Sequence, residues 1–319
     1  MTGGRVVIGG ANGFVGAHLV RRYRDAGREV VTIGRHGCDV TWNDPEGIRR
    51  AIDGAGLVIG LAGKSVNCRY NATNRAEIFR SRLDTTAALS RAIATATTPP
   101  PVWINSSTAT IYRHAMDRPQ TESTGESGSG FSVSVAQAWE RALMADALPT
   151  TRRVALRTAI VLGDGGVFAM LRALARRGLG GSAWDGWWPV SRSRREAGTA
   201  HVSGSRRGEQ RFSWIHLDDL ARAIELIEER NDLSGPINAS APNPVTNREL
   251  MREVRRVSGA VIGPPMPRWV SEIGAILIRT ETELILKSRW VLPETLTNAG
   301  FTFRHPDLPE ALRSIVDAG

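Results

Sequence analysis

The sequence predicts an α/β fold, a doubly wound parallel sheet with a smaller C-terminal substrate subdomain, from two observations. Short apolar segments typical of buried strands alternate with amphipathic segments of helical period through the first half of the chain. A glycine-rich turn joins the first apolar segment to the first amphipathic one. Strands that alternate with helices of this length are connected by right-handed crossovers, which gives a parallel sheet with helices on both faces.

The predicted elements alternate strictly in the first half of the chain. In the second helix Asp44 is placed to cap the N-terminus, and Pro45 takes the first helical position. We expect strands at residues 5–10, 28–34, 56–63, 102–107 and 152–163. We expect helices at residues 14–26, 44–52, 73–95 and 133–146.

The second half follows a different pattern. A helix is expected at residues 167–177, and the stretch 180–209, rich in glycine, serine and arginine, predicts a mobile loop. Residues 212–230 return to a strand followed by a helix, and the tail from Pro264 onward has helical patterns broken by prolines. The predicted division is a sheet domain at 1–163, to which 212–232 return, and a smaller subdomain at 164–319.

Composition and charge argue against several classes of protein. The chain of 319 residues is 41% hydrophobic and 23% charged, which is ordinary for a protein with a buried core. No apolar run is long enough to span a bilayer, and we expect no signal peptide. The two cysteines and six histidines show no metal-ligand spacing. Because the net charge of +9 comes from arginines spread along the chain, we expect no nucleic-acid partner, and we expect a cytoplasmic location.

The strongest motif is the glycine-rich turn, Gly10-Ala-Asn-Gly13-Phe-Val-Gly16. The first glycine allows the tight turn, the second lets the main chain approach a pyrophosphate, and the third lets the helix pack on the strand. The helix N-terminus adds free N–H groups and the positive end of its dipole. The alternative is a plain turn, but the strand before it and the helix after it favour a Rossmann-type dinucleotide site. Further contacts are expected from Asn12, Phe14 and Val15.

The end of the second strand indicates which dinucleotide binds. A site specific for NAD has a carboxylate about 20 residues after the glycine turn, where it bonds the ribose 2′-hydroxyl. Here Gly34 and Arg35 stand at that place. A carboxylate repels a 2′-phosphate, whereas an arginine binds it through two hydrogen bonds. The sequence therefore favours NADP(H), and the alternative is that Arg35 is a solvated loop residue.

The spacing of the glycines resembles the extended short-chain dehydrogenase/reductase superfamily, which includes nucleotide-sugar epimerases and dehydratases. Two further segments resemble that superfamily. "DVT" is similar to its adenine-contacting segment, and "GLAG" is similar to its fourth-strand motif. The resemblance implies that the cofactor is contacted by Asp39, Val40, Leu61, Ala62 and Gly63.

Longer stretches resemble one atypical branch, the epimerase-like family of bacterial and mitochondrial NADP-binding proteins. They run from residue 5 to the C-terminus and include "FRSRLDTT", "LRTAIVLG", "FSWIHLDDL" and "VLPETLTNAGF". The resemblance implies that Asp84 and Arg157 lie near the cofactor. The chain departs from the family at residues 182–207, where members have a much shorter connection.

The Tyr-x-x-x-Lys pair that short-chain dehydrogenases use for catalysis is absent. In that pair the lysine lowers the pKa of the tyrosine, which passes a proton to the substrate oxygen. Alignment of Glu140 with a glutamate of the family's helix puts Ser132 and Ala136 at the two places. The residues four places after the tyrosines are Gly27 after Tyr23, Asn74 after Tyr70 and Met116 after Tyr112.

What remains of the site predicts an NADP(H)-dependent oxidoreductase or epimerase-like enzyme that acts on a small polar or anionic molecule. Ser107, Thr108 and Tyr112 would supply hydrogen bonds in place of the missing pair. Lys64 and Arg69 are candidates to hold a substrate anion, or they are solvated loop charges. Because the pair is missing, the alternative function is a non-catalytic NADP(H)-binding sensor or regulatory protein. The substrate and the oligomeric state are left open.

Overall fold

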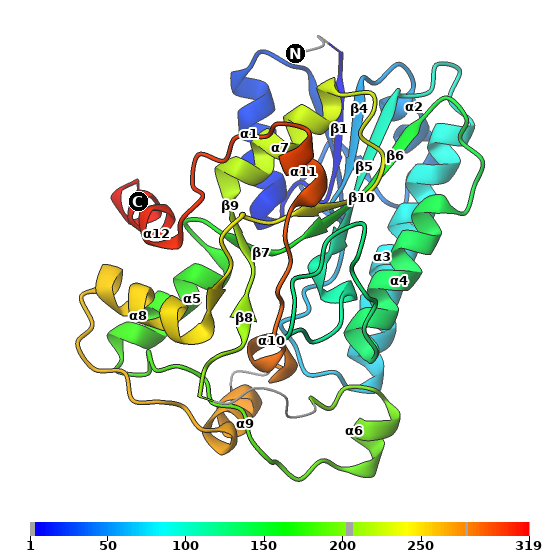
Figure 1. Cartoon of the computed structure of the whole chain (residues 1–319). Helices are drawn as coiled ribbons and strands as arrows, with labels where there is room; N and C mark the ends of the chain where they lie inside the picture. Colours follow the sequence, from blue (N-terminus) through cyan, green and yellow to red (C-terminus); the bar gives the residue numbers. More distant parts are fainter. Residues whose placement is uncertain (1–3, 202–206, 278–279, 319) are drawn as a thin grey trace.

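A seven-stranded parallel sheet is the main element of the computed structural model, which describes residues 4–201, 207–277 and 280–318 (Figure 1). The strand order is β10-β6-β5-β4-β1-β2-β3. The chain runs outward from β1 in one direction and then from β4 in the other, which confirms the predicted doubly wound sheet. The strands are β1 (Val6–Gly9), β2 (Val30–Gly34), β3 (Val40–Thr41), β4 (Leu57–Gly60), β5 (Val102–Thr108), β6 (Arg152–Thr158) and β10 (Gly235–Ala239).

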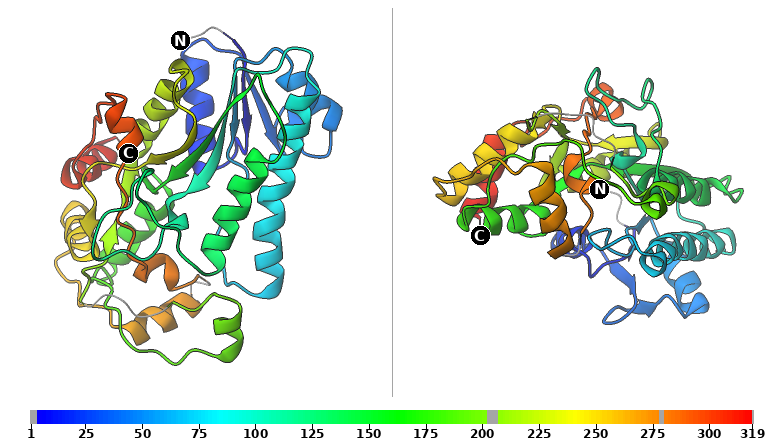
Figure 2. Two further views of the ribbon diagram at one scale, coloured as in Figure 1. Left: turned by 45° about the vertical axis from the view of Figure 1, so that its right-hand side comes forward. Right: turned by 90° about the horizontal axis from the view of Figure 1, so that it is seen from below.

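Helices cover both faces of the sheet, because successive strand residues point to opposite sides. Val6 and Ile8 of β1 pack with α1 and α7, whereas Val7 packs with α2 and α3. Figures 1 and 2 show α3 and α4 running side by side along one face. The helices are α1 (Phe14–Asp25), α2 (Pro45–Ile52), α3 (Ala72–Ala94), α4 (Phe131–Met144) and α7 (Leu217–Glu229).

The predicted cap of α2 is confirmed. Asp44 Oδ1 accepts a hydrogen bond from the main-chain N–H of Gly47 at 2.8 Å, and Pro45 begins the helix. A free N–H of the first turn thereby finds a partner. No helix among the described residues is both long and apolar enough to cross a membrane.

A second lobe has its own apolar core and lies below the sheet in Figure 1. Phe168, Trp214, Val254 and Leu312 meet in this core. The remaining elements are η1 (Ala109–Ile111), β7 (Ile160–Leu162), α5 (Gly166–Arg176), α6 (Arg192–Glu196), β8 (Arg211–Phe212), β9 (Trp214–His216), β11 (Val245–Thr246), α8 (Asn247–Ser258), α9 (Arg268–Leu277), α10 (Glu283–Leu286), α11 (Glu294–Asn298) and α12 (Leu308–Asp317).

The second half of the chain returns to the sheet at more places than the sequence predicted. β10, within the predicted 164–319 subdomain, is the edge strand and pairs with β6. Leu296 of α11 packs into the core beneath β1. Within the predicted return at 212–232, α7 covers the sheet, but β9 pairs with β7 in a separate two-stranded sheet. A long-range pairing of this kind leaves no local sequence signal.

The irregular stretch at residues 180–209 is anchored in the part of it that the structure describes. Asp185 Oδ2 lies 2.8 Å from His201 Nε2, and Asp185 Oδ1 accepts from Arg268 Nη1 at 2.8 Å. The stretch also contains the short helix α6. Residues 202–206, on which the prediction of a mobile loop also falls, lie outside the described residues.

Candidate functional site

The glycine-rich turn packs so closely on neighbouring main chain that two of its glycines admit no side chain. Gly10 has a φ of +83°, and a Cβ there would lie 2.8 Å from the nitrogen of Ala62. A Cβ on Gly16 would lie 2.4 Å from the carbonyl oxygen of Gly10. Gly13 is exposed, and the nearest atom to a Cβ there is 3.4 Å away. The open side of the turn is thus at Gly13, where a pyrophosphate would approach.

A cavity of about 280 Å³ adjoins this turn, at the point where the strand order reverses. In open α/β sheets, ligands bind at such a reversal. The ring of Phe14 closes one side, because it lies against Gly165, where a Cβ would be 3.0 Å from the ring. The cavity is lined by Gly13, Phe14, Val15, Gly16, Leu61 and Ser106, among others.

The end of β2 leaves one arginine available. Arg35 is exposed, and its guanidinium makes no hydrogen bond or ion pair within the described part of the chain. Gly34, just before it, has no room for a Cβ, which would lie 2.3 Å from Cys38 Sγ. Asn12 from the turn donates to the carbonyl oxygen of His36 at 2.7 Å and so fixes this loop beside the glycines. The residues present fit a dinucleotide with a 2′-phosphate.

Asp39, the residue before β3, holds β3 beside β2 through hydrogen bonds to Thr32. Its Oδ2 accepts from the main-chain N–H of Thr32 at 2.8 Å and from the Thr32 hydroxyl at 2.7 Å. These hydrogen bonds hold the pKa of Asp39 below its ordinary value. Val40, the next residue, pairs with Ile33. The structure therefore places Asp39 and Val40 in the supporting frame of the predicted cofactor site.

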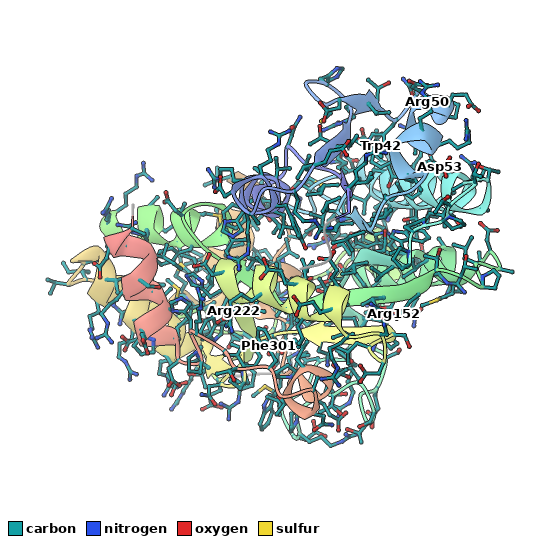
Figure 3. All side chains as sticks on the ribbon, turned by 90° about the horizontal axis from the view of Figure 1, so that it is seen from above. Trp42, Arg50, Asp53, Arg152, Arg222 and Phe301 are labelled. Atoms are coloured by element: carbon teal, nitrogen blue, oxygen red, sulfur yellow. The ribbon has the colours of Figure 1, made fainter. Side chains whose placement is uncertain are left out.

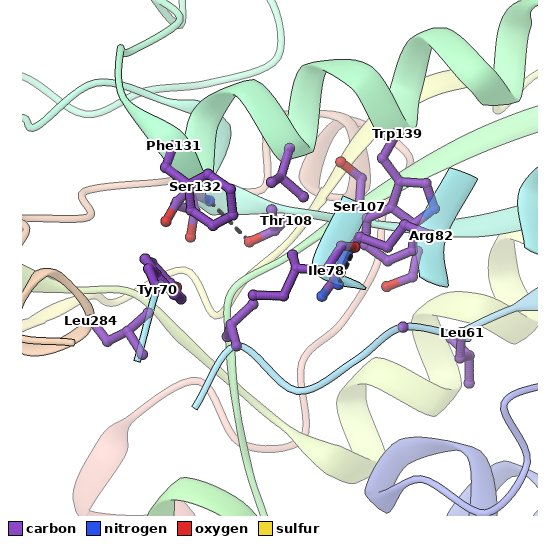
Figure 4. Close-up of a pocket in the computed structure, with 15 residues that line it drawn as sticks. Leu61, Tyr70, Ile78, Arg82, Ser107, Thr108, Phe131, Ser132, Trp139 and Leu284 are labelled. Carbon is purple, nitrogen blue, oxygen red and sulfur yellow. Dashed lines mark hydrogen bonds between the residues drawn. The ribbon is translucent and has the colours of Figure 1, made fainter. Parts of the chain in front are cut away.

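A second cavity, of about 230 Å³, opens where β5 ends (Figure 4). It shares Leu61 and Ser106 with the first cavity, so a molecule held here lies next to the cofactor turn. Ser107 and Thr108, two of the predicted catalytic residues, line it. Thr108 Oγ1 accepts from the N–H of Thr110 at 3.2 Å, which leaves the Thr108 hydroxyl hydrogen available to a ligand.

Arg82 brings a positive charge to the wall of the second cavity (Figure 4). Its guanidinium lies 4.9 Å from the ring centroid of Trp139. Nη1 donates to the carbonyl oxygens of Lys64 and Ile78, both at 3.1 Å, and Gly63 leaves room for the group. Among the described residues no carboxylate pairs with Arg82. Burial without such a partner lowers the pKa of Arg82 to about 10.

Tyr70 brings a phenol to the same cavity, beside Ser132 (Figure 4). Its ring packs against that of Phe131 with centroids 4.8 Å apart, and the residue is 6% exposed. Burial raises the pKa of Tyr70 to about 12, so the phenol is neutral at pH 7. Ser132, which aligns with the tyrosine of the family's catalytic pair, donates to Glu283 Oε2 at 3.1 Å.

Tyr112, the third predicted catalytic residue, does not line either cavity. Its hydroxyl donates to Asn238 Oδ1 at 3.0 Å and accepts from Arg157 Nη1 at 2.9 Å. Arg157 in turn forms a bidentate ion pair with Glu140, with both distances 2.8 Å. Ser107 donates to the same carboxylate at 2.6 Å. These hydrogen bonds fix the orientation of the Ser107 hydroxyl. They also engage the hydroxyl of Tyr112 and the guanidinium of Arg157.

Three other predicted residues are exposed or bonded to other groups of the protein. Asp84 is exposed on α3 and lines neither cavity. Lys64 pairs with Glu77, and Arg69 donates to the carbonyl oxygen of Thr280 at 2.9 Å. Of the three residues predicted by resemblance just after β4, Leu61 and Gly63 line the second cavity, while Ala62 packs on Gly10.

Sequence reasoning missed Tyr70, Arg82 and Trp139. A signal for Arg82 exists in α3, because Ile78, Arg82 and Leu89 fall on one stripe of the helix and both apolar members are buried. An arginine on a buried stripe indicates a polar site, and here Arg82 bonds two carbonyl oxygens and lines the second cavity. No comparable signal marks Tyr70, which precedes α3 in an irregular loop.

With the fold and the two cavities described, family comparison gives the class of protein. Residues 6–239 match the model of the NAD dependent epimerase/dehydratase family, and residues 266–315 match a domain of unknown function, DUF1731. The chain belongs to the NAD dependent epimerase/dehydratase family. This confirms the resemblance to extended short-chain dehydrogenases.

Individual relatives of this family are similar to the chain over nearly its whole length. The chain is 31% identical to the epimerase family protein SDR39U1 of Bos taurus, over 98% of this chain and 99% of that protein. It is 26% identical to the epimerase family protein YfhF of Bacillus subtilis, with 98% and 97% covered. The crystal structure of human SDR39U1 (isoform 2) with NADPH superposes with a TM-score of 0.82 at 27% identity, with 98% and 99% covered. That relative binds NADPH.

Proposed function

We propose that this chain is an NADP(H)-dependent oxidoreductase that reduces a small anionic carbonyl compound held against Arg82. The observation that carries the proposal is the guanidinium of Arg82, which faces a cavity beside the cofactor turn without a carboxylate partner among the described residues. An uncompensated charge in a half-buried site is costly, and a ligand anion removes that cost through charge-assisted hydrogen bonds.

The cofactor assignment is supported by the open side at Gly13, by the unpaired guanidinium of Arg35 and by the relative that binds NADPH. NADPH, when bound, supplies a hydride to the carbonyl carbon. Arg35 would bind the 2′-phosphate, because Gly34 and Arg35 occupy the place where an NAD-specific site has its carboxylate.

The cavity residues hold and protonate the substrate. Arg82 binds its anionic group, and the hydroxyl of Thr108 donates to the carbonyl oxygen. Tyr70 passes its phenolic proton to that oxygen as the hydride arrives, and water restores the proton. With a pKa near 12, Tyr70 is a proton donor but a poor base at pH 7, so reduction is favoured over alcohol oxidation. A cavity of about 230 Å³ lies below the usual size of ligand pockets and favours a small substrate over a sugar nucleotide.

The test is a screen of NADPH oxidation with 2-oxo acids and aldehyde acids, each beside its methyl ester. We expect acids to be reduced at least tenfold faster than esters, and Arg82→Gln to raise the KM for acids at least tenfold without weakening NADPH binding. Arg80→Gln is the matched control, because Arg80 is an exposed arginine on the same helix. Equal rates for acids and esters, or an Arg82→Gln enzyme equal to wild type, would refute the anionic substrate.

The second candidate function is a non-catalytic NADP(H)-binding sensor, and the absence of the Tyr-x-x-x-Lys pair favours it. α4 presents Ser132 and Ala136 where the pair would stand. Tight NADPH binding without turnover of any compound in the screen would favour this function.

A further inference from the structure

Three imidazoles and a carboxylate meet where α1, α7 and the C-terminal segment come together. His18 lies on α1, His216 precedes α7, Asp218 is in the first turn of α7, and His305 lies between α11 and α12. Ligand atoms of His216, Asp218 and His305 all lie within 4.8 Å of one another. His18 Nε2 lies 3.4 Å from Asp218 Oδ1. None of the four residues lines either cavity, so the cluster is separate from the proposed active site.

Two nitrogen atoms of this cluster are buried without a hydrogen-bond partner in the described part of the chain. They are Nε2 of His18 and Nδ1 of His305. Buried polar atoms in folded proteins almost always have a partner, and an exception indicates strain or a missing ion or water. Nε2 of His18 lies 3.4 Å from Asp218 Oδ1, so the atom left without any hydrogen-bond or ion-pair partner among the described residues is Nδ1 of His305, and a bound cation can account for it.

The segment that carries His305 is fixed against α7. The two carboxylate oxygens of Asp219 accept from the main-chain N–H groups of Arg304 and His305, both at 2.8 Å. The guanidinium of Arg222 lies 5.1 Å from the ring centroid of Phe301 (Figure 3). The main chain at His305 is therefore held in place before any ligand binds, which lowers the entropy lost on binding.

We propose that His216, Asp218 and His305 bind one Zn²⁺ ion, with His18 as the nearest further nitrogen donor. Imidazole nitrogen and carboxylate oxygen are ligands that Zn²⁺ takes at about 2.0–2.1 Å in a tetrahedron, whose edge is then about 3.3 Å. The distance of 3.4 Å from His18 Nε2 to Asp218 Oδ1 already matches such an edge. The ligand atoms of His216, Asp218 and His305, which lie within 4.8 Å of one another, must move closer together to reach this edge. The Asp218 side chain is 40% exposed and can move, whereas the rings of His216 and His305 are stacked with centroids 3.9 Å apart and must turn.

His216 is the ligand that changes most on binding. Its Nδ1 now accepts from the main-chain N–H of Asp218 at 3.1 Å and so caps α7. Zinc at Nδ1 replaces this cap bond. The ion would link the start of α7 to the C-terminal segment, and it would therefore stabilise the fold.

The experiment uses the full chain without a histidine tag, dialysed against EDTA and titrated with ZnCl₂ by calorimetry. We expect one Zn²⁺ per chain and a rise in Tm on adding zinc. His305→Gln and Asp218→Asn should each weaken zinc binding at least tenfold and abolish the rise in Tm. His36→Gln is the matched control, because His36 is exposed and outside the cluster, and it should bind zinc as wild type does.

Circular dichroism in EDTA shows whether each variant folds. If His305→Gln does not fold, Asp218→Asn decides the question, because the partly exposed Asp218 side chain is not needed for the cap. The proposal is overturned if wild type binds no zinc, or if the folded variants bind it as tightly as wild type.

Discussion

The cofactor turn and the second cavity are built from different atoms. At the turn the close contacts join main chain to main chain, as between Gly10 and Ala62 or between Gly16 and Gly10. The walls of the cavity are side chains from separate elements, among them Tyr70, Arg82 and Ser132. A main-chain site tolerates almost no change at its closely packed glycines, here Gly10 and Gly16, whereas the side chains of a cavity can be replaced without moving the main chain. This difference explains why the chain can have the glycine turn of its family without the Tyr-x-x-x-Lys pair, which consists of side chains alone.

The largest effect is expected where main chain meets main chain. In Gly16→Ala the new methyl group would lie 2.4 Å from the carbonyl oxygen of Gly10, so α1 must shift away from β1. We expect a loss of about 3 kcal/mol in the free energy of unfolding and a loss of NADPH binding of more than tenfold. Urea denaturation and NADPH titration measure the two effects. Gly13→Ala is the control: its nearest contact is 3.4 Å, so it should fold with near wild-type stability.

A smaller effect, confined to the cofactor, is expected at Arg35. Arg35→Ala removes a side chain that makes no hydrogen bond or ion pair within the described residues, so stability should not change. The affinity for NADPH should fall by about tenfold to a hundredfold, which is roughly the worth of one or two charge-assisted hydrogen bonds. The affinity for NADH should stay as it is, since that cofactor lacks the 2′-phosphate. Titration of both cofactors by tryptophan fluorescence measures this, and an equal loss for both would show that Arg35 does not select NADP(H).

The smallest effect is expected behind the cavity, at Tyr112. Tyr112→Phe removes the hydroxyl between Asn238 and Arg157 and leaves those two groups one hydrogen bond short. We expect a loss of about 1–2 kcal/mol in the free energy of unfolding. Reductase activity should change less than threefold, because the hydroxyl is outside the cavity. Tyr70→Phe, in contrast, should lower kcat at least tenfold. The opposite behaviour of the two variants would support the sequence-based prediction that Tyr112 is catalytic and would contradict the proposed role of Tyr70.

Much of the fold and of the cofactor turn could be predicted because their causes are local. The strand, the three glycines and the helix lie within the first 25 residues, and the positive φ of Gly10 and the contact of Gly16 with Gly10 arise within this segment. The alternation of strands and helices likewise predicted the parallel sheet. The edge strand β10 was missed, since five residues beginning with Gly235-Pro236 show no strand period and depend on pairing with β6.

By itself, then, the sequence determined three features. The glycine turn and the parallel sheet follow from residues that are close together in the chain, and the catalytic pair is absent because no tyrosine has a lysine four residues after it. Only the tertiary structure decided which side chains share a space. It brought Arg82 and Tyr70 to one cavity, buried Tyr112 away from it, and gathered His216 and His305, 89 positions apart, around Asp218. No spacing rule reveals such a group, because its members meet only after the sheet has formed and α7 has docked against the C-terminal segment.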